Sequence, residues 1–324
     1  MSNRSGKSRA LLLLLLIGVF AGACRSGPTP TDTPAGPLPT LPTAASGTPL
    51  PASPSPAPVS PTYTPIPTPT ATPTAVVPVT PRAVLTPLPA GGCRLGTALR
   101  QETAPILVKH RANPGFVMVS TVELAKTYFP QLEGWIRVIG APSLDALASK
   151  AQRADDAGLA YEGLVYGLET GKSTPAGEWQ DLIGSTQKAR ALADRYGKLL
   201  VMGPGFKLMS ANESKYAGMA ALADIWMFQT QQLQKEPPGP AYRQEVERVI
   251  GLIRAGKPGV QIWTQITLPP DRDPNAEEWL AYRRLINDLV DGTYVGAYTW
   301  NTMDPQVLVS TIDAIFSSAC GAGQ

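Results

Sequence analysis

The segment VQIWTQIT, residues 260–267, alternates between two sets of side chains. Alternation with a period of two predicts a β-strand, because successive side chains of a strand point to opposite faces. One face is suited to packing beneath helices and holds Val260, Ile262, Thr264 and Ile266. The other face holds Gln261, Trp263, Gln265 and Thr267. We expect this second, more polar face to look into the interior of a barrel.

The segment belongs to a series of short apolar runs that alternate with amphipathic stretches, as repeated βα units do. Predicted strands span 116–121, 135–141, 164–169, 199–203, 224–229, 260–267 and 295–300, with 106–110 as a possible eighth. Predicted helices span 143–156, 187–195, 242–254, 276–290 and 305–316. Residues 93–324 therefore suit a single small (β/α) TIM-type barrel. A doubly wound open sheet is the alternative, disfavoured because no glycine-rich phosphate loop follows any strand.

The N-terminus has the three parts of an export signal. Basic residues at Arg4, Lys7 and Arg9 precede an apolar stretch, residues 10–20, and small residues follow it. The stretch is shorter than the roughly 20 apolar residues that a transmembrane helix needs. We interpret residues 1–23 as a signal peptide that is removed from the mature protein.

Four residues at the end of this segment, Ala21-Gly22-Ala23-Cys24, resemble the bacterial lipobox. The resemblance implies that Cys24 carries a diacylglycerol, whose two acyl chains suffice for stable anchoring. The alternative is an ordinary secretory cleavage site with Cys24 merely the next residue. We expect a membrane-anchored lipoprotein outside the cytoplasm, at the cell surface or the periplasmic face.

Residues 24–92 form a segment rich in Pro and Thr, which contains 20 of the 34 prolines of the chain. Such a composition cannot bury a core and favours an extended, semi-rigid polyproline conformation. The sequence therefore predicts a disordered tether between the anchored cysteine and the barrel.

The net charge of +3 comes from the signal segment, which holds Arg4, Lys7 and Arg9 and no acidic residue. Without residues 1–23 the chain keeps 25 Lys and Arg against 25 Asp and Glu. A near-neutral protein gives no reason to propose nucleic acid as a partner.

Three cysteines are present, and a lipidated Cys24 leaves Cys93 and Cys320. These two bracket the predicted barrel, in a compartment that is oxidising. We expect one disulfide between the ends of the domain.

Polar and aromatic side chains gather at the predicted carboxyl ends of the strands, where barrel enzymes place their active groups. Glu169 is the carboxylate of this set. The surrounding candidates are Arg137, Gln229, Gln231, Trp263, Gln265, Tyr298 and Trp300. Amides donate to and accept from hydroxyls, and sugar rings stack on aromatic faces, so the mixture suits a neutral carbohydrate. The alternative is a structural network in which Glu169 pairs with Arg137.

The last 200 residues resemble secreted (β/α)-barrel domains that are distantly similar to glycoside hydrolases. The resemblance rests on Tyr166-Gly167-Leu168-Glu169 followed by Thr174-Pro175, on Gln229-Thr230-Gln231 and on Thr299-Trp300-Asn301. Chitinase-like barrels carry acidic residues at alternate positions before a catalytic glutamate. Glu169 matches that glutamate, but Val165 and Gly167 occupy the acidic positions, which argues against substrate-assisted hydrolysis.

Hydrolysis of a glycoside needs a proton donor and a second carboxylate. Glu169 is the candidate acid, and Glu123 and Asp304 are the candidate partners. The single histidine, His110, excludes a multi-histidine metal site, and we expect no metal and no cofactor. Three functions stay open: a glycoside hydrolase-like barrel that acts on a polysaccharide or cell-wall glycan, a non-catalytic carbohydrate-binding or adhesion module, and a solute-binding lipoprotein.

Overall fold

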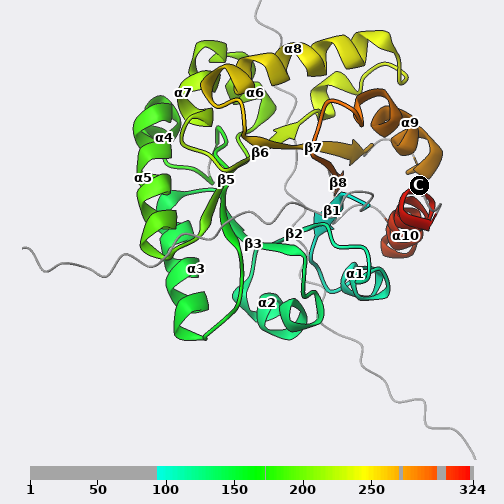
Figure 1. Ribbon diagram of the computed structural model, residues 1–324, viewed down its shortest axis with the longest axis horizontal. Helices are drawn as coiled ribbons and strands as arrows, with labels where there is room; N and C mark the ends of the chain where they lie inside the picture. The colour runs from blue at the N-terminus through cyan, green and yellow to red at the C-terminus, as the bar shows by residue number, and fades with distance from the viewer. Residues whose placement is uncertain (1–92, 172, 270–272, 298–303, 322–324) are drawn as a thin grey trace, which may run out of the picture. The chain divides into compact units, whose positions relative to one another are not determined.

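The computed structural model describes residues 93–171, 173–269, 273–297 and 304–321. They form a closed barrel of parallel strands in which each strand pairs with its neighbour in the chain and β8 pairs with β1 (Figure 1). The strands are β1 (Leu95–Ala98), β2 (Phe116–Val119), β3 (Ile136–Ala141), β4 (Gly163–Tyr166), β5 (Leu199–Met202), β6 (Ile225–Gln229), β7 (Gln261–Leu268) and β8 (Gly292–Ala297). The predicted TIM-type barrel is confirmed, and the open sheet is wrong.

Helices surround the barrel on its outer side (Figure 1). They are α1 (Ala104–Lys109), α2 (Val122–Tyr128), α3 (Leu144–Asp156), α4 (Ala176–Gln180), α5 (Leu182–Arg195), α6 (Phe206–Ser210), α7 (Tyr216–Ala220), α8 (Pro240–Gly256), α9 (Ala276–Ile286) and α10 (Pro305–Gly321). Short 3₁₀ turns are η1 (Phe129–Gln131), η2 (Glu213–Lys215) and η3 (Gln231–Leu233). None of these helices, in the ranges that the structure describes, is long and apolar enough to span a membrane.

The first strand is where the sequence prediction is wrong. Residues 106–110 lie in and just after helix α1, and the eighth strand is β1. Pro105 stands in the first turn of α1, where its missing N–H costs nothing, and Ile106 and Leu107 are buried. Strand β1 has four residues, one of them Gly96, so its apolar run is too short to be recognised as a strand from the sequence. Gly96 is required there, because a Cβ would lie 2.5 Å from the Phe116 carbonyl oxygen.

Two separate sets of buried side chains stabilise the barrel. The larger set packs between the sheet and the helices. The smaller set fills the interior and consists of Phe116, Ile136, Val138, Val165, Leu199, Val201, Ile225, Met227, Trp263 and Tyr294. A barrel whose interior is packed in this way is a filled core rather than a pore, and barrels of this kind carry their active groups at the carboxyl ends of the strands.

A disulfide joins the two ends of the described domain. Cys93 precedes β1 and Cys320 lies in the last turn of α10, and their Cα atoms are 4.8 Å apart across a sequence separation of 227. This confirms the predicted pairing. Figure 1 shows α10 beside α1 and α9, next to the seam where β8 meets β1. The bond therefore links the residue before β1 to the helix that follows β8, beside the place where the barrel closes.

Candidate functional site

Two adjoining pockets open at the carboxyl ends of the strands. The first, here called the amide pocket, has a volume of about 500 Å³. Its walls include Glu169, Gly203, Gly205, Lys207, Gln229, Gln231, Gln232, Gln265 and Thr267. The second, here called the lysine pocket, has a volume of about 340 Å³. Its walls include Arg100, Ser120, Gly140, Lys150, Glu169, Ser173, Gln265 and Tyr294. Glu169 and Gln265 line both, so the pockets form one continuous mouth.

Glu169 follows β4 and is exposed at the rim that the two pockets share. Strand alternation predicts its position correctly, since Val165 and Gly167 also line the mouth while Leu168 packs in the outer core. The Glu169 side chain lies against Gly205, where a Cβ would stand 3.3 Å from its Cγ. The glycine therefore leaves room for the carboxylate to reach the pocket.

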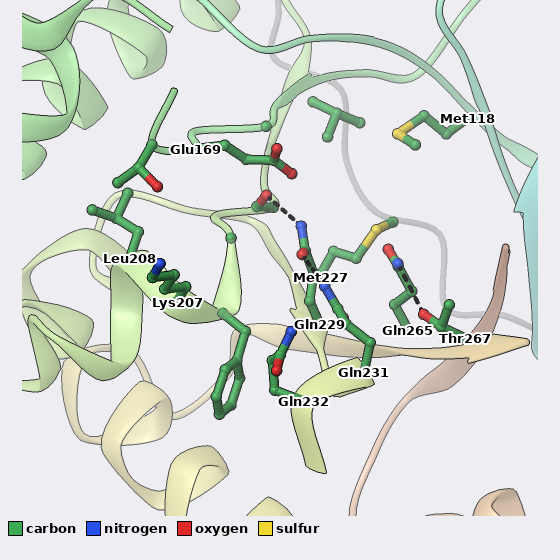
Figure 2. Close-up of a pocket in the computed structure, with 16 residues that line it drawn as sticks. Met118, Glu169, Lys207, Leu208, Met227, Gln229, Gln231, Gln232, Gln265 and Thr267 are labelled. Carbon is green, nitrogen blue, oxygen red and sulfur yellow. Dashed lines mark hydrogen bonds between the residues drawn. The ribbon is translucent and has the colours of Figure 1, made fainter. Parts of the chain in front are cut away.

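A chain of amides crosses the amide pocket opposite Glu169 (Figure 2). The Gln231 amide nitrogen donates to the Gln229 oxygen at 2.8 Å, and the Gln229 nitrogen donates to the Gly203 carbonyl at 3.3 Å. The Gln231 amide oxygen is buried and has no hydrogen-bond partner among the described residues. An unpaired buried acceptor is costly, so this oxygen is available to a hydroxyl of a ligand.

The end of β7 supplies the floor of the same pocket. Gln265 donates through its amide nitrogen to the Thr267 hydroxyl at 3.3 Å. The Thr267 backbone is fixed by Gln234, which accepts from its N–H at 2.9 Å and donates to its carbonyl at 3.0 Å. The inward direction predicted for Gln265 and Thr267 is confirmed, and both are held by hydrogen bonds.

Arg137 does not point into the barrel, and this prediction is wrong. Its inward neighbours on β3 are Ile136 and Val138, whereas Arg137 faces outward. The guanidinium forms two hydrogen bonds to the Glu162 carboxylate, at 2.7 and 3.1 Å, and one to the Phe129 carbonyl at 3.0 Å. Arg137 is therefore structural, and its carboxylate partner is Glu162.

Trp263 points inward as predicted but lies too deep to stack on a ligand at the mouth. Its side chain is fully buried in the interior cluster, with its ring centroid 5.2 Å from that of Phe116. Gly292 on the neighbouring strand leaves the room that the indole fills. Tyr298 and Trp300 lie outside the described residues.

The candidate partners of Glu169 have other roles, and none of them lines either pocket. Glu123 is exposed on α2 and pairs with Arg153 on α3. A hydrogen bond to its own backbone, and after it the hydrogen bond from Arg153, lowers the pKa of Glu123. Asp304 accepts from the Gln306 N–H at 2.8 Å and so caps α10. Among the described lining residues, Glu169 is the single carboxylate of the mouth.

Glu178 follows Glu169 in the chain and likewise turns away from the mouth. Its carboxylate accepts from the Leu144 N–H at the start of α3, at 3.0 Å, and from the Tyr166 hydroxyl at 2.6 Å. A carboxylate at a helix N-terminus offsets the helix dipole and satisfies an unpaired N–H. Glu178 therefore holds α3 against β4.

The lysine pocket contains residues that the sequence did not point to. Lys150 lies on α3 among Leu147, Ala151 and Ala154, the buried residues of that helix. Its ammonium donates to the Gly140 carbonyl at 2.7 Å. A lysine at a position of the apolar face is the signal that could have found it, but it stands on a helix rather than at a strand end.

Groups of three or more His, Cys, Asp or Glu suited to hold a metal ion are absent from the described ranges. His110 is half-buried, lies 3.1 Å from the Asp313 carboxylate through its Nε2 and packs against Phe316. Its contacts tie α1 to α10 away from the mouth, which is a structural role.

Comparison with known proteins identifies no family. No family model matches the chain, and no curated protein matches it by sequence. A β-1,3-glucanosyltransferase of Rhizomucor miehei is 12% identical, with 67% of this chain and 97% of that one covered and a TM-score of 0.43. A protein of Aquifex aeolicus VF5 is 11% identical, with 70% and 91% covered and a TM-score of 0.44. A 2,3-dimethylmalate lyase is 8% identical, with 72% and 85% covered and a TM-score of 0.40. Likeness at this level assigns none of their activities to this chain.

Proposed function

We propose that residues 93–324 form a carbohydrate-binding barrel, displayed on the outer side of a membrane by lipidated Cys24 and the tether of residues 24–92. The observation that carries the proposal is the composition of the amide pocket. Four glutamine side chains line it, from Gln229, Gln231, Gln232 and Gln265, and Glu169 is the single carboxylate among the described lining residues.

Glutamine amides suit a polyhydroxylated ligand because each offers two donors and an acceptor with no net charge. The chain from Gln231 through Gln229 to the Gly203 carbonyl holds these amides in place before a ligand arrives. Preorganised side chains lose less entropy on binding than free ones do. The arrangement therefore favours recognition of sugar hydroxyls.

The positions of the other acids favour binding over hydrolysis. Hydrolysis with two carboxylates requires them on opposite sides of one glycosidic bond, about 5 to 10 Å apart. Glu123 forms an ion pair with Arg153 and Asp304 caps a helix, and neither lines the pockets that Glu169 lines. Hydrolysis with Glu169 as general acid is the second candidate, and the placement of this side chain at a strand end, across from the amides, favours it.

The barrel can be tested as residues 93–324, because its sheet closes on itself and the disulfide joins its ends. Affinity electrophoresis against a panel of soluble polysaccharides, and sedimentation with insoluble glycans and cell wall, measure binding. Gln265→Ala should weaken retention about tenfold, as expected for loss of well-placed hydrogen bonds. Gln187→Ala, an exposed glutamine on α5, is the matched control and should bind as the wild type does.

Reducing-end release in the same samples separates the two candidates. Retention without release supports the binding domain. Release that disappears in Glu169→Gln establishes hydrolysis instead. Absence of retention and of release across the panel would contradict both.

A further inference from the structure

We infer that the glycan carries an anionic group, a carboxylate or a phosphate, which the lysine pocket receives through the Lys150 ammonium and the Tyr294 hydroxyl. The inference rests on the proposed function and specifies its ligand. In this arrangement hydroxyls of one sugar unit meet the amide pocket, and the charged substituent of the same or the next unit enters the lysine pocket.

Lys150 is a half-buried cation that has no carboxylate partner among the residues that the structure describes. Its hydrogen bond in the described structure goes to the Gly140 carbonyl, and that bond uses one of three donors. Burial lowers the pKa of Lys150, and the neighbouring Arg153 acts in the same direction. A nearby carboxylate would act in the opposite direction. The partly desolvated ammonium thus has a neutral carbonyl as its described partner, and an incoming anion would add a charged one.

Tyr294 is a second, independent sign of a ligand in the same pocket. Its side chain is 2% exposed, and its hydroxyl has no hydrogen-bond partner among the described residues. Buried hydroxyls are nearly always bonded in native proteins, so this one calls for a partner from the pocket that it lines. Burial raises the pKa of Tyr294, which keeps the hydroxyl protonated and able to donate.

The remaining charges of the pocket are compatible with an anion. Arg100 follows β1 and lines the pocket, close enough for its charge to act on Tyr294. Glu169 opposes an anion, but it is exposed at the rim shared with the amide pocket, where water screens its charge. Hydroxyls of Ser120 and Ser173 add further donors to the wall. The described lining of the lysine pocket thus contains two cations and three hydroxyls that favour an anion, and one exposed carboxylate that opposes it.

Matched pairs of polymers test the inference on the barrel of residues 93–324. One pair is alginate and its carboxyl-reduced form, and the other is bacterial cell wall before and after removal of its phosphate polymers. The wild type should bind the acidic member of at least one pair about tenfold more tightly at low salt. The preference should shrink at high salt, and the pair that shows it distinguishes a carboxylate from a phosphate.

Variants assign the preference to the pocket. Lys150→Met keeps the aliphatic stem and should abolish the preference, measured as the ratio of the affinities for the two members of a pair. Lys150→Arg should keep it, and Tyr294→Phe should lower it several-fold. Lys215→Met removes a charge from an exposed lysine in η2, outside both pockets, and should leave the preference intact.

The failures can be told apart. Equal binding of both members by the wild type, or a preference that persists in folded Lys150→Met and in Tyr294→Phe, would overturn the anionic ligand while the binding domain stands. Loss of all binding, neutral and acidic, would overturn the proposed function and the inference with it.

Discussion

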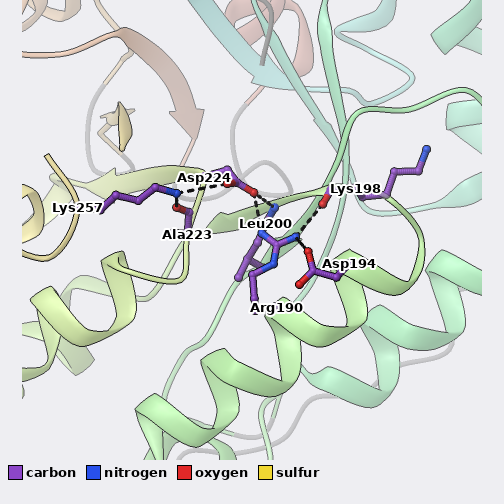
Figure 3. A network of polar contacts seen from close by, with 7 residues as sticks. All are labelled: Arg190, Asp194, Lys198, Leu200, Ala223, Asp224 and Lys257. Atoms are coloured by element: carbon purple, nitrogen blue, oxygen red, sulfur yellow. Dashed lines mark hydrogen bonds and ion pairs between the residues drawn. The ribbon is translucent and has the colours of Figure 1, made fainter. Parts of the chain in front are cut away.

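The Asp224 carboxylate accepts a hydrogen bond from the Arg190 guanidinium at 2.7 Å and thereby ties helix α5 to the start of strand β6 (Figure 3). The same carboxylate accepts from the Leu200 N–H at 2.9 Å and lies 3.4 Å from the Lys257 ammonium. Asp224 is 6% exposed. A buried acid with these partners belongs to the framework at the amino ends of the strands, on the side opposite the mouth.

Asp224→Asn should therefore destabilise the barrel by about 3 kcal/mol, because it removes the buried one of the two carboxylates that pair with the largely buried Arg190 guanidinium. Urea unfolding of the two proteins measures the difference. Asp194→Asn is the matched control, since Asp194 also pairs with Arg190, at 2.7 Å, but is half exposed. Asp194→Asn should lower the unfolding free energy by less than about 1 kcal/mol. Equal losses of unfolding free energy in both variants would show that the buried pair of Arg190 and Asp224 stabilises the barrel no more than the half-exposed pair of Arg190 and Asp194.

Gly296→Ala should weaken glycan binding by displacing the Gln265 side chain. A Cβ at residue 296 would lie 2.8 to 3.0 Å from three atoms of the Gln265 side chain, so this amide has to move. We expect a loss of affinity comparable to that of Gln265→Ala, measured by affinity electrophoresis. Gly251→Ala on α8 meets nothing within 4 Å and is the control. Wild-type affinity in Gly296→Ala would place Gln265 outside the binding surface.

Removal of the disulfide should lower the stability of the domain by about 2 to 5 kcal/mol. The large effect is expected because the bond closes a loop across 227 residues and so restricts the unfolded chain strongly. Urea unfolding of the double variant Cys93→Ser, Cys320→Ser, compared with the oxidised wild type, measures it. An unchanged midpoint of urea unfolding would mean that strand pairing and helix packing stabilise the junction of β8 and β1 without help from the disulfide.

The ion pair of Arg243 and Asp288 should make stability depend on pH in the acid range. The two side chains form hydrogen bonds at 2.6 and 2.8 Å, and these bonds lower the pKa of Asp288 to about 2. The folded pKa is depressed, so the contribution is complete above the ordinary aspartate pKa of about 4 and is lost as the pH falls through 2. The difference in unfolding free energy between wild type and Asp288→Asn should shrink over this range. A difference that is constant from pH 5 to pH 2 would contradict the assignment.

Periodicity predicted most of the fold and part of the site. Alternation along residues 260–267 correctly directs Gln265 and Thr267 inward, and the same rule brings Glu169 to the mouth. It failed at Arg137, because β3 has apolar residues on both faces, as buried parallel strands do, and so offers no contrast to read. It also placed Trp263 on the correct face but at the wrong height, because depth depends on the stagger between strands.

The sequence by itself determined the succession of strands and helices, the pairing of Cys93 with Cys320 and the face of each polar residue on β7. These features follow from local periodicity and from the small number of cysteines. Only the tertiary structure decided that Glu123 pairs with Arg153, that Asp304 caps α10, and that Lys150 and Tyr294 line one pocket. The reason is physical: closure of the sheet joins β8 to β1 and sets which helix covers which strand, so residues 144 positions apart meet through contacts that no local pattern encodes.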